Sequence, residues 1–213
     1  MTIRAARPYA GRLTAVVATA DDGGSTGRLR ADLRIPAPGD LRRCLVAMSG
    51  EEDGPWGRAL EHRFDGTDVE GHALGNLLLA GLEAVTGDFL GATAAVAGLL
   101  GLDPARHRVV PATVSPVDLW ARTEGGEQVR GQVAVSQTEG IAEVGLDPAL
   151  AMAPAEVPAA IMEADQVVLG PGDLYTSVLA AAIVDEVREA LVASKAQVVY
   201  VCNVGAENPE TRG

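Results

Sequence analysis

Three short apolar runs with little polar alternation predict a buried parallel sheet. They lie at about 12–20, 166–169 and 197–202, and they are rich in valine, alanine and leucine. A strand that is covered on both faces reads as a nearly continuous apolar run, whereas a half-exposed strand alternates. The pattern therefore predicts an α/β fold in which helices cover the sheet.

Helical spacing of apolar residues predicts those covering layers. The clearest helix follows the segment 71–76, and a second spans about 88–100 with Asp88 as its N-cap. Asp40 is most simply the N-cap of another helix, although it is also a candidate ligand-binding residue, and residues 1–11 look irregular. Further helices are expected at 28–33, 41–48, 56–64, 155–164 and 174–191, the last one broken near Asp185.

The apolar period changes after Arg108, where strands replace helices. Strands are predicted at 109–113, 117–123, 128–136 and 141–146, and the Glu-Gly-Gly-Glu turn at 124–127 joins two of them as a hairpin. Since no crossover helix separates these strands, they are expected to be antiparallel. The 213 residues therefore suit one domain, 1–213, with a small β-rich insertion at about 108–147.

Composition and charge narrow the classes of partner. The formal net charge of −12 disfavours non-specific binding to nucleic acid or to an anionic membrane, because the field of the protein repels phosphate. Two distant cysteines give no disulfide framework, and no apolar run is long enough to span a bilayer. These features predict a cytoplasmic protein with a small-molecule partner, and they leave a homo-oligomer open.

The polar stretch 21–30 follows the first predicted strand and is the first candidate site. Ligands bind at the carboxyl ends of strands in open α/β sheets, and glycines allow the backbone to approach a ligand closely. The alternative is a plain turn with arginines on a solvated helix. The candidate ligand-binding residues here are Asp21, Asp22, Gly23, Gly24, Ser25 and Arg28.

A Gly-Pro-Gly turn after the second predicted strand is the better candidate for holding a nucleotide or phosphate. The start of the following helix carries partial positive charge, although Asp173 or Ser177 could simply cap that helix. Tyr175 is either a core residue or a stacking platform for a base. The candidate residues of this loop are Gly170, Pro171, Gly172, Asp173, Leu174, Tyr175, Thr176 and Ser177.

Further candidates come from a third strand end and from a glycine-flanked helix start. Asn203 ends the third predicted strand, and the three strand-end loops are expected to converge on one edge of the sheet. His72 and Asn76 lie at the helix start, where His72 is as consistent with a structural role as with a ligand contact. Asp21 or Asp22 is a candidate for holding Mg²⁺ through waters. No complete P-loop or nucleophile elbow is present, so Asp21 and Asp22 are the only candidates for a catalytic role.

Five ordered motifs together resemble the family of the gluconeogenesis factor YvcK, which is related to the 2-phospho-L-lactate transferase CofD. They are Asp-Asp-Gly-Gly-Ser-Thr-Gly-Arg-Leu-Arg at 21–30, Pro-Gly-Asp at 38–40 with Cys-Leu at 44–45, Gly-His with Gly-Asn-Leu at 71–77, Gly-Pro-Gly-Asp-Leu-Tyr-Thr-Ser at 170–177, and Val-Cys-Asn at 201–203.

The resemblance implies a Rossmann-like three-layer fold, a cytoplasmic location and binding of a nucleotide sugar such as UDP-N-acetylglucosamine. It also implies a regulatory role in carbon metabolism, cell-wall precursor supply and cell shape, without turnover. The alternative is an Mg²⁺-dependent transferase that moves a phospholactyl group to a deazaflavin, as in coenzyme F420 biosynthesis. Relative to the family pattern, the chain is expected to be truncated at both ends, before Leu13 and after Asn203.

Overall fold

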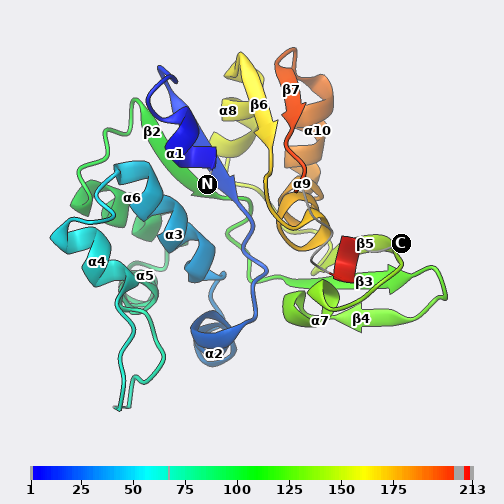
Figure 1. Ribbon diagram of the computed structural model, residues 1–213, viewed down its shortest axis with the longest axis horizontal. Helices are drawn as coiled ribbons and strands as arrows, with labels where there is room; N and C mark the ends of the chain where they lie inside the picture. The colour runs from blue at the N-terminus through cyan, green and yellow to red at the C-terminus, as the bar shows by residue number, and fades with distance from the viewer. Residues whose placement is uncertain (1, 67, 204–208, 212–213) are drawn as a thin grey trace.

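The computed structural model describes residues 2–66, 68–203 and 209–211, and the described chain alternates between helices and short strands (Figure 1). In chain order the elements are α1 (Thr2–Ala6), β1 (Leu13–Val17), α2 (Gly24–Leu33), α3 (Pro38–Ser49), α4 (Pro55–Glu61), α5 (Leu74–Thr86), α6 (Phe89–Leu99), β2 (His107–Pro111), β3 (Asp118–Thr123), β4 (Gln128–Arg130), α7 (Gln132–Ser136), β5 (Ile141–Asp147), α8 (Glu156–Glu163), β6 (Gln166–Leu169), the π-helical η1 (Leu174–Leu179), α9 (Ala180–Ala182), α10 (Asp185–Ala193), β7 (Gln197–Tyr200) and the 3-10 helix η2 (Pro209–Thr211).

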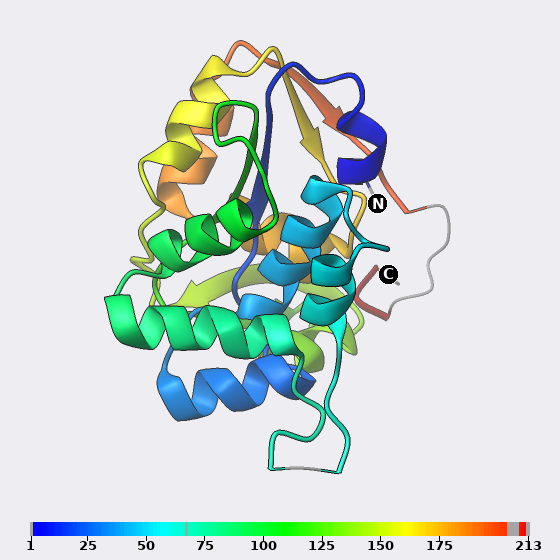
Figure 2. The same ribbon diagram turned by 90° about the vertical axis from the view of Figure 1, so that its left-hand side faces the viewer.

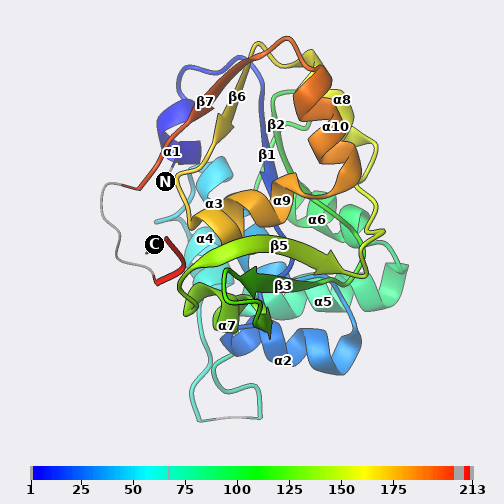
Figure 3. The same ribbon diagram turned by 90° about the vertical axis from the view of Figure 1, so that its right-hand side faces the viewer.

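Two pairs of parallel strands form the centre of the molecule. β1 pairs with β2 from Leu13 opposite His107, and β6 pairs with β7 from Gln166 opposite Gln197. The two pairs lie side by side in Figures 1 and 3, in the order β7, β6, β1, β2. The predicted α/β class with parallel strands is therefore confirmed.

Two hydrophobic clusters on opposite faces of β1 explain why its sequence is mostly apolar. Val17 belongs to the cluster built mainly from α3, α5 and α6, whereas the neighbouring Val16 packs against the cluster that contains α8 and α10. β2 divides in the same way, because Val109 joins the first cluster and Val110 the second. Figure 2 shows the helices that cover the first face. The result is a helix–strand–helix arrangement of three layers.

The β-rich part is a separate antiparallel sheet with the strand order β4-β3-β5. Its β3–β4 hairpin, with Trp120 opposite Arg130, confirms the predicted turn at 124–127. The prediction was wrong for two segments. β2 belongs to the parallel sheet, because α2 to α6 supply the crossover from β1. Residues 132–136 form α7, because Gly131 turns the chain at φ +94° and directs only Val135 fully into the core.

Three helix starts also differ from the sequence expectation. Residues 2–6 form α1, and α2 begins at Gly24 rather than at Arg28. Asp40 is not an N-cap, because Pro38 opens α3 and Ala37 occupies the cap position. Asp88 does cap α6, since its carboxylate accepts a hydrogen bond from the amide of Gly91 at 2.8 Å. The predicted break near Asp185 is present between α9 and α10. In the described ranges, no helix is long and apolar enough to cross a membrane.

The packing of α3 generates a first prediction. Leu45 is fully buried, so Leu45→Ala is expected to lower the free energy of unfolding by about 2–5 kcal/mol, through lost burial and the cavity left behind. Leu150→Ala is the matched control, because Leu150 is 83% exposed and its truncation should cost less than about 0.5 kcal/mol. Urea denaturation of both variants measures the difference. Equal losses would contradict the assigned core.

Candidate functional site

A pocket of about 250 Å³ opens at the N-terminus of α2. The N-cap residue, Gly23, has no side chain that can cap the helix, so the first turn of α2 presents backbone N–H groups and partial positive charge. Gly39 allows α3 to approach this turn, because a Cβ atom there would lie 2.4 Å from Oγ1 of Thr26. The residues lining the pocket are Asp21, Gly23, Gly24, Ser25, Thr26, Gly39, Arg42, Arg43 and Arg63.

Three arginines make this pocket basic in an acidic protein. Arg42 is 3% exposed, and burial lowers the pKa of its guanidinium even though the adjacent Glu61 raises it. Arg43 pairs with Asp40, and the carboxylates of Asp40 and Asp21 raise its pKa despite its burial. Arg63 donates through Nη1 to the carbonyl of Gly71 at 2.9 Å. Positive side chains and a helix N-terminus together form a site suited to an anion.

A continuous hydrogen-bond chain runs from Arg42 along one wall of the pocket. Arg42 Nη1 donates to Asn76 Oδ1 at 2.8 Å, and Asn76 Nδ2 donates to Ser25 Oγ at 3.1 Å. Ser25 Oγ lies 3.0 Å from Nδ1 of His72. Burial, helped by nearby Arg28 and Arg63, lowers the pKa of His72 and favours its neutral form. These hydrogen bonds thus connect Ser25 of α2, Arg42 of α3 and Asn76 of α5 with His72 in one network.

The adjacent carboxylates of Asp21 and Asp22 accept hydrogen bonds from different parts of the chain. Asp21 Oδ1 accepts from the amide of Gly23 at 2.9 Å and lines the pocket. Asp22 Oδ1 accepts from the amide of Val133 at 2.9 Å, so it holds α7 instead. The described residues contain no group of three or more histidine, cysteine or acidic side chains that could hold a metal ion. This donor set does not fit a Mg²⁺ site built from protein side chains.

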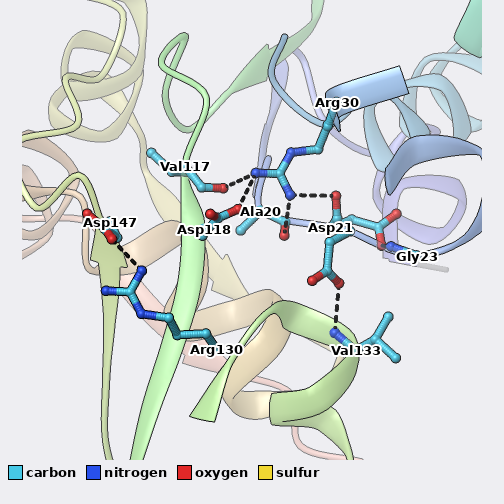
Figure 4. Close-up of polar contacts among 10 residues, drawn as sticks. Ala20, Asp21, Gly23, Arg30, Val117, Asp118, Arg130, Val133 and Asp147 are labelled. Atoms are coloured by element: carbon cyan, nitrogen blue, oxygen red, sulfur yellow. Dashed lines mark hydrogen bonds and ion pairs between the residues drawn. The ribbon is translucent and has the colours of Figure 1, made fainter. Parts of the chain in front are cut away.

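Arg30 joins the site loop to the antiparallel sheet, as Figure 4 shows. Its Nη1 donates to the carbonyls of Ala20 at 3.3 Å and Asp21 at 3.1 Å. Its Nη2 donates to the carbonyl of Val117 and to the carboxylate of Asp118, the latter at 2.9 Å. Arg28 donates to the carbonyl of Glu70 at 2.7 Å and is not among the residues that line the pocket.

The loop at 170–177 forms a second polar cluster outside the pocket. Asn203 Nδ2 donates to the carbonyl of Gly172 at 3.2 Å, so the ends of β6 and β7 do meet. The Tyr175 side chain packs against the core and donates to the carbonyl of Ile141 at 3.2 Å, while its amide donates to Glu210 Oε1 at 3.1 Å. Burial raises the pKa of Glu210.

Helix α7 separates this second cluster from the pocket. It contacts η1, which begins at Leu174 within the segment 170–177, and its Val133 amide donates to the Asp22 carboxylate. The strands β1, β6 and β7 end at the same edge of the molecule in Figures 1 and 3, but neither residues 170–177 nor Asn203 line the pocket at α2. Ligand binding by residues 170–177 remains a prediction.

Some of the residues that line the pocket were predicted from the sequence as ligand contacts, and others were not. Asp21, Gly23, Gly24 and Ser25 line it, and His72 and Asn76 reach it through Ser25. Sequence reasoning missed Thr26, Gly39, Arg42, Arg43 and Arg63. The adjacent pair of arginines in an acidic chain was a usable signal for Arg42 and Arg43. Arg63 carried no local signal, since only tertiary contacts place it here.

The family model of the 2-phospho-L-lactate transferase CofD matches residues 1–213. The chain belongs to the CofD family. This membership confirms the resemblance based on the five motifs and, with the layers described above, the Rossmann-like α/β fold.

Relatives within this CofD family carry the name gluconeogenesis factor. The chain is 41% identical over 213 residues to the gluconeogenesis factor of Halalkalibacterium halodurans, covering 99% of this chain and 65% of the relative. It is 41% identical over 202 residues to that of Bacillus subtilis, covering 93% of this chain and 62% of the relative. A crystal structure of a UPF0052 family protein from Bacillus halodurans superimposes with a TM-score of 0.89 at 40% identity, covering 95% of this chain and 64% of that one. The chain thus spans less than two thirds of these relatives.

The contacts of Arg30 generate a second prediction. Arg30→Gln should lower the free energy of unfolding by about 1–3 kcal/mol, because it leaves buried carbonyls without their charged donor. Arg130→Gln is the control, since it removes an exposed pair with Asp147 and should cost less than about 1 kcal/mol. Urea denaturation measures both, and hydrogen exchange should show weakened protection in β3 only for Arg30→Gln. Unchanged exchange in β3 would refute the assigned role of Arg30.

Proposed function

We propose that the pocket at α2 binds the diphosphate of a nucleotide sugar, with UDP-N-acetylglucosamine as the first candidate. The observation that carries this proposal is the pairing of an uncapped helix N-terminus with Arg42, Arg43 and Arg63 in one pocket of about 250 Å³. Phosphate oxygens accept hydrogen bonds from the backbone N–H groups of a helix N-terminus and from arginine guanidinium groups. The net charge of −12 makes such a concentration of arginine notable and disfavours an extended polyanion as the ligand.

The proposed role is regulatory binding in the cytoplasm rather than turnover. The relatives named gluconeogenesis factor support a link to carbon metabolism, to which the motif resemblance adds cell-wall precursor supply and cell shape. The pocket lining suits binding of an anion, because it combines three arginines with the uncapped first turn of α2. The 170–177 loop is proposed as a secondary contact for the nucleoside.

A transferase is the second candidate, favoured by the name of the matching family model. It predicts formation of product from a deazaflavin acceptor and a guanylylated phospholactate donor. Asp22 is a poor choice for testing it, because its carboxylate holds α7 and does not line the pocket. Asp21→Asn is the better variant. Product formed by the wild-type protein and lost in Asp21→Asn would replace the regulatory proposal.

Calorimetry with UDP-N-acetylglucosamine provides the direct test of binding. The 213-residue protein should give saturable heat, and Arg63→Gln should weaken binding by about tenfold or more, because a hydrogen bond from a charged group contributes about 1.5–3 kcal/mol. Arg58→Gln is the control on the neighbouring helix α4, where Arg58 lies outside the pocket. Absence of heat with UDP-N-acetylglucosamine and with UDP-glucose would overturn the proposal.

A further inference from the structure

The direction of the first two hydrogen bonds in the wall of the pocket follows from the first donor, Arg42. The Arg42 guanidinium can only donate, so the Asn76 atom that receives Nη1 at 2.8 Å is the amide oxygen. The Asn76 amide nitrogen therefore points to Ser25 Oγ at 3.1 Å and donates to it. Because Ser25 already accepts from Asn76, its own hydrogen is available for Nδ1 of His72, 3.0 Å away.

This arrangement favours one tautomer of neutral His72, because donation to Nδ1 gives the Ser25 hydroxyl hydrogen an acceptor while the pocket is empty. When Ser25 donates to Nδ1, that nitrogen is the acceptor and the imidazole hydrogen is on Nε2. Ser25 then offers the pocket only its second lone pair. An anion in the pocket meets an oxygen lone pair at this position, which is unfavourable.

Protonation of His72 reverses the last hydrogen bond. Both ring nitrogens of an imidazolium are donors, so Nδ1 then donates to Ser25 Oγ. Ser25 now accepts from both His72 and Asn76, and its hydroxyl hydrogen has no acceptor left within the chain of bonds. Since Ser25 lines the pocket at the start of α2, that hydrogen can serve an anion there.

We propose that anion binding in this pocket is coupled to uptake of one proton by His72, with Ser25 reversing its hydrogen bond to become a donor to the bound phosphate. This inference rests on the proposed function, because it concerns the same pocket. Ser25 contacts the anion directly, and His72 acts through Ser25 as a positioning residue. The hydrogen bonds from Arg42 to Asn76 and from Asn76 to Ser25 keep their direction, because the Arg42 guanidinium can only donate.

The charges around His72 agree with this coupling. Arg28 and Asp32 of α2 and Arg63 before α5 act on the imidazole, and together with burial the two arginines lower its pKa while the pocket is empty. A bound dianion supplies the opposite charge and raises that pKa. Because the pKa is higher in the bound state, binding takes up a proton. Affinity therefore rises as the pH falls from above the bound-state pKa to below that of the empty protein.

Nuclear magnetic resonance of the histidine rings provides the test, and His72→Gln assigns the His72 signals among the three histidines. In the free wild-type protein, neutral His72 should be the Nε2–H tautomer. The Nδ1–H tautomer would overturn the proposal without any ligand or variant, so this measurement decides even if a variant fails to fold.

The second measurement is the pKa of His72 with and without saturating UDP-N-acetylglucosamine, whose diphosphate diester does not titrate near neutral pH. The pKa should rise by about one pH unit in the wild-type protein, which corresponds to about tenfold tighter binding at acidic pH. In Ser25→Ala, with its fold checked by circular dichroism, most of the rise should be lost. An equal rise in Ser25→Ala would show simple charge attraction and overturn the reversal.

Sulfate distinguishes failure of this proposal from failure of the proposed function. If UDP-N-acetylglucosamine does not bind, the nucleotide-sugar proposal fails, and the same titration is made with sulfate, a dianion that does not titrate in this range. A Ser25-dependent rise with sulfate supports the coupling for anions in general. An unchanged pKa of His72 with both anions overturns it.

Discussion

The buried guanidinium of Arg42 is the interaction on which the candidate site depends. Arg42 lies on α3 and is 3% exposed, and it bonds to Glu61 at the end of α4 and to Asn76 on α5. Asn76 in turn bonds to Ser25 on α2, so one cation connects four helices. The Glu61 side chain is 40% exposed, but the Arg42 guanidinium is buried, so loss of its partners would leave a buried charge uncompensated. The helices around the pocket are therefore held in one arrangement.

Two glycines make room for this arrangement. A Cβ atom at position 75 would lie 2.7 Å from Cγ of Arg42, so Gly75 is needed where the arginine stem crosses α5. A Cβ atom at Gly39 would meet Thr26, so this glycine is needed where α3 meets α2. The Gly-Asn and Pro-Gly-Asp motifs thus have a packing explanation that does not require a ligand. Their consequence for function is indirect, because the close packing places Ser25 and the arginines around the same pocket.

A second set of contacts joins the pocket loop to the antiparallel sheet. Asp22 holds α7 and Arg30 holds the start of β3, so the loop between β1 and α2 is supported from two sides. Asp22 and Arg30 of this motif therefore position the backbone and do not line the pocket. The loop therefore does two things: Asp22 and Arg30 hold the neighbouring antiparallel sheet and α7, and Gly23 begins α2 without a side-chain cap.

The sequence by itself determined the α/β class, the buried character of β1, the antiparallel hairpin at 124–127 and the family. Local periodicity and ordered motifs carry that information, since they depend on near neighbours in the chain. The tertiary structure alone decided the partner of β2, the helical state of α7 and the pointing of Asp22 away from the pocket. It also brought Arg63 to the pocket, whose lining does not include residues 170–177. These features depend on contacts between residues far apart in sequence, and such contacts leave no period or spacing that the sequence alone can display.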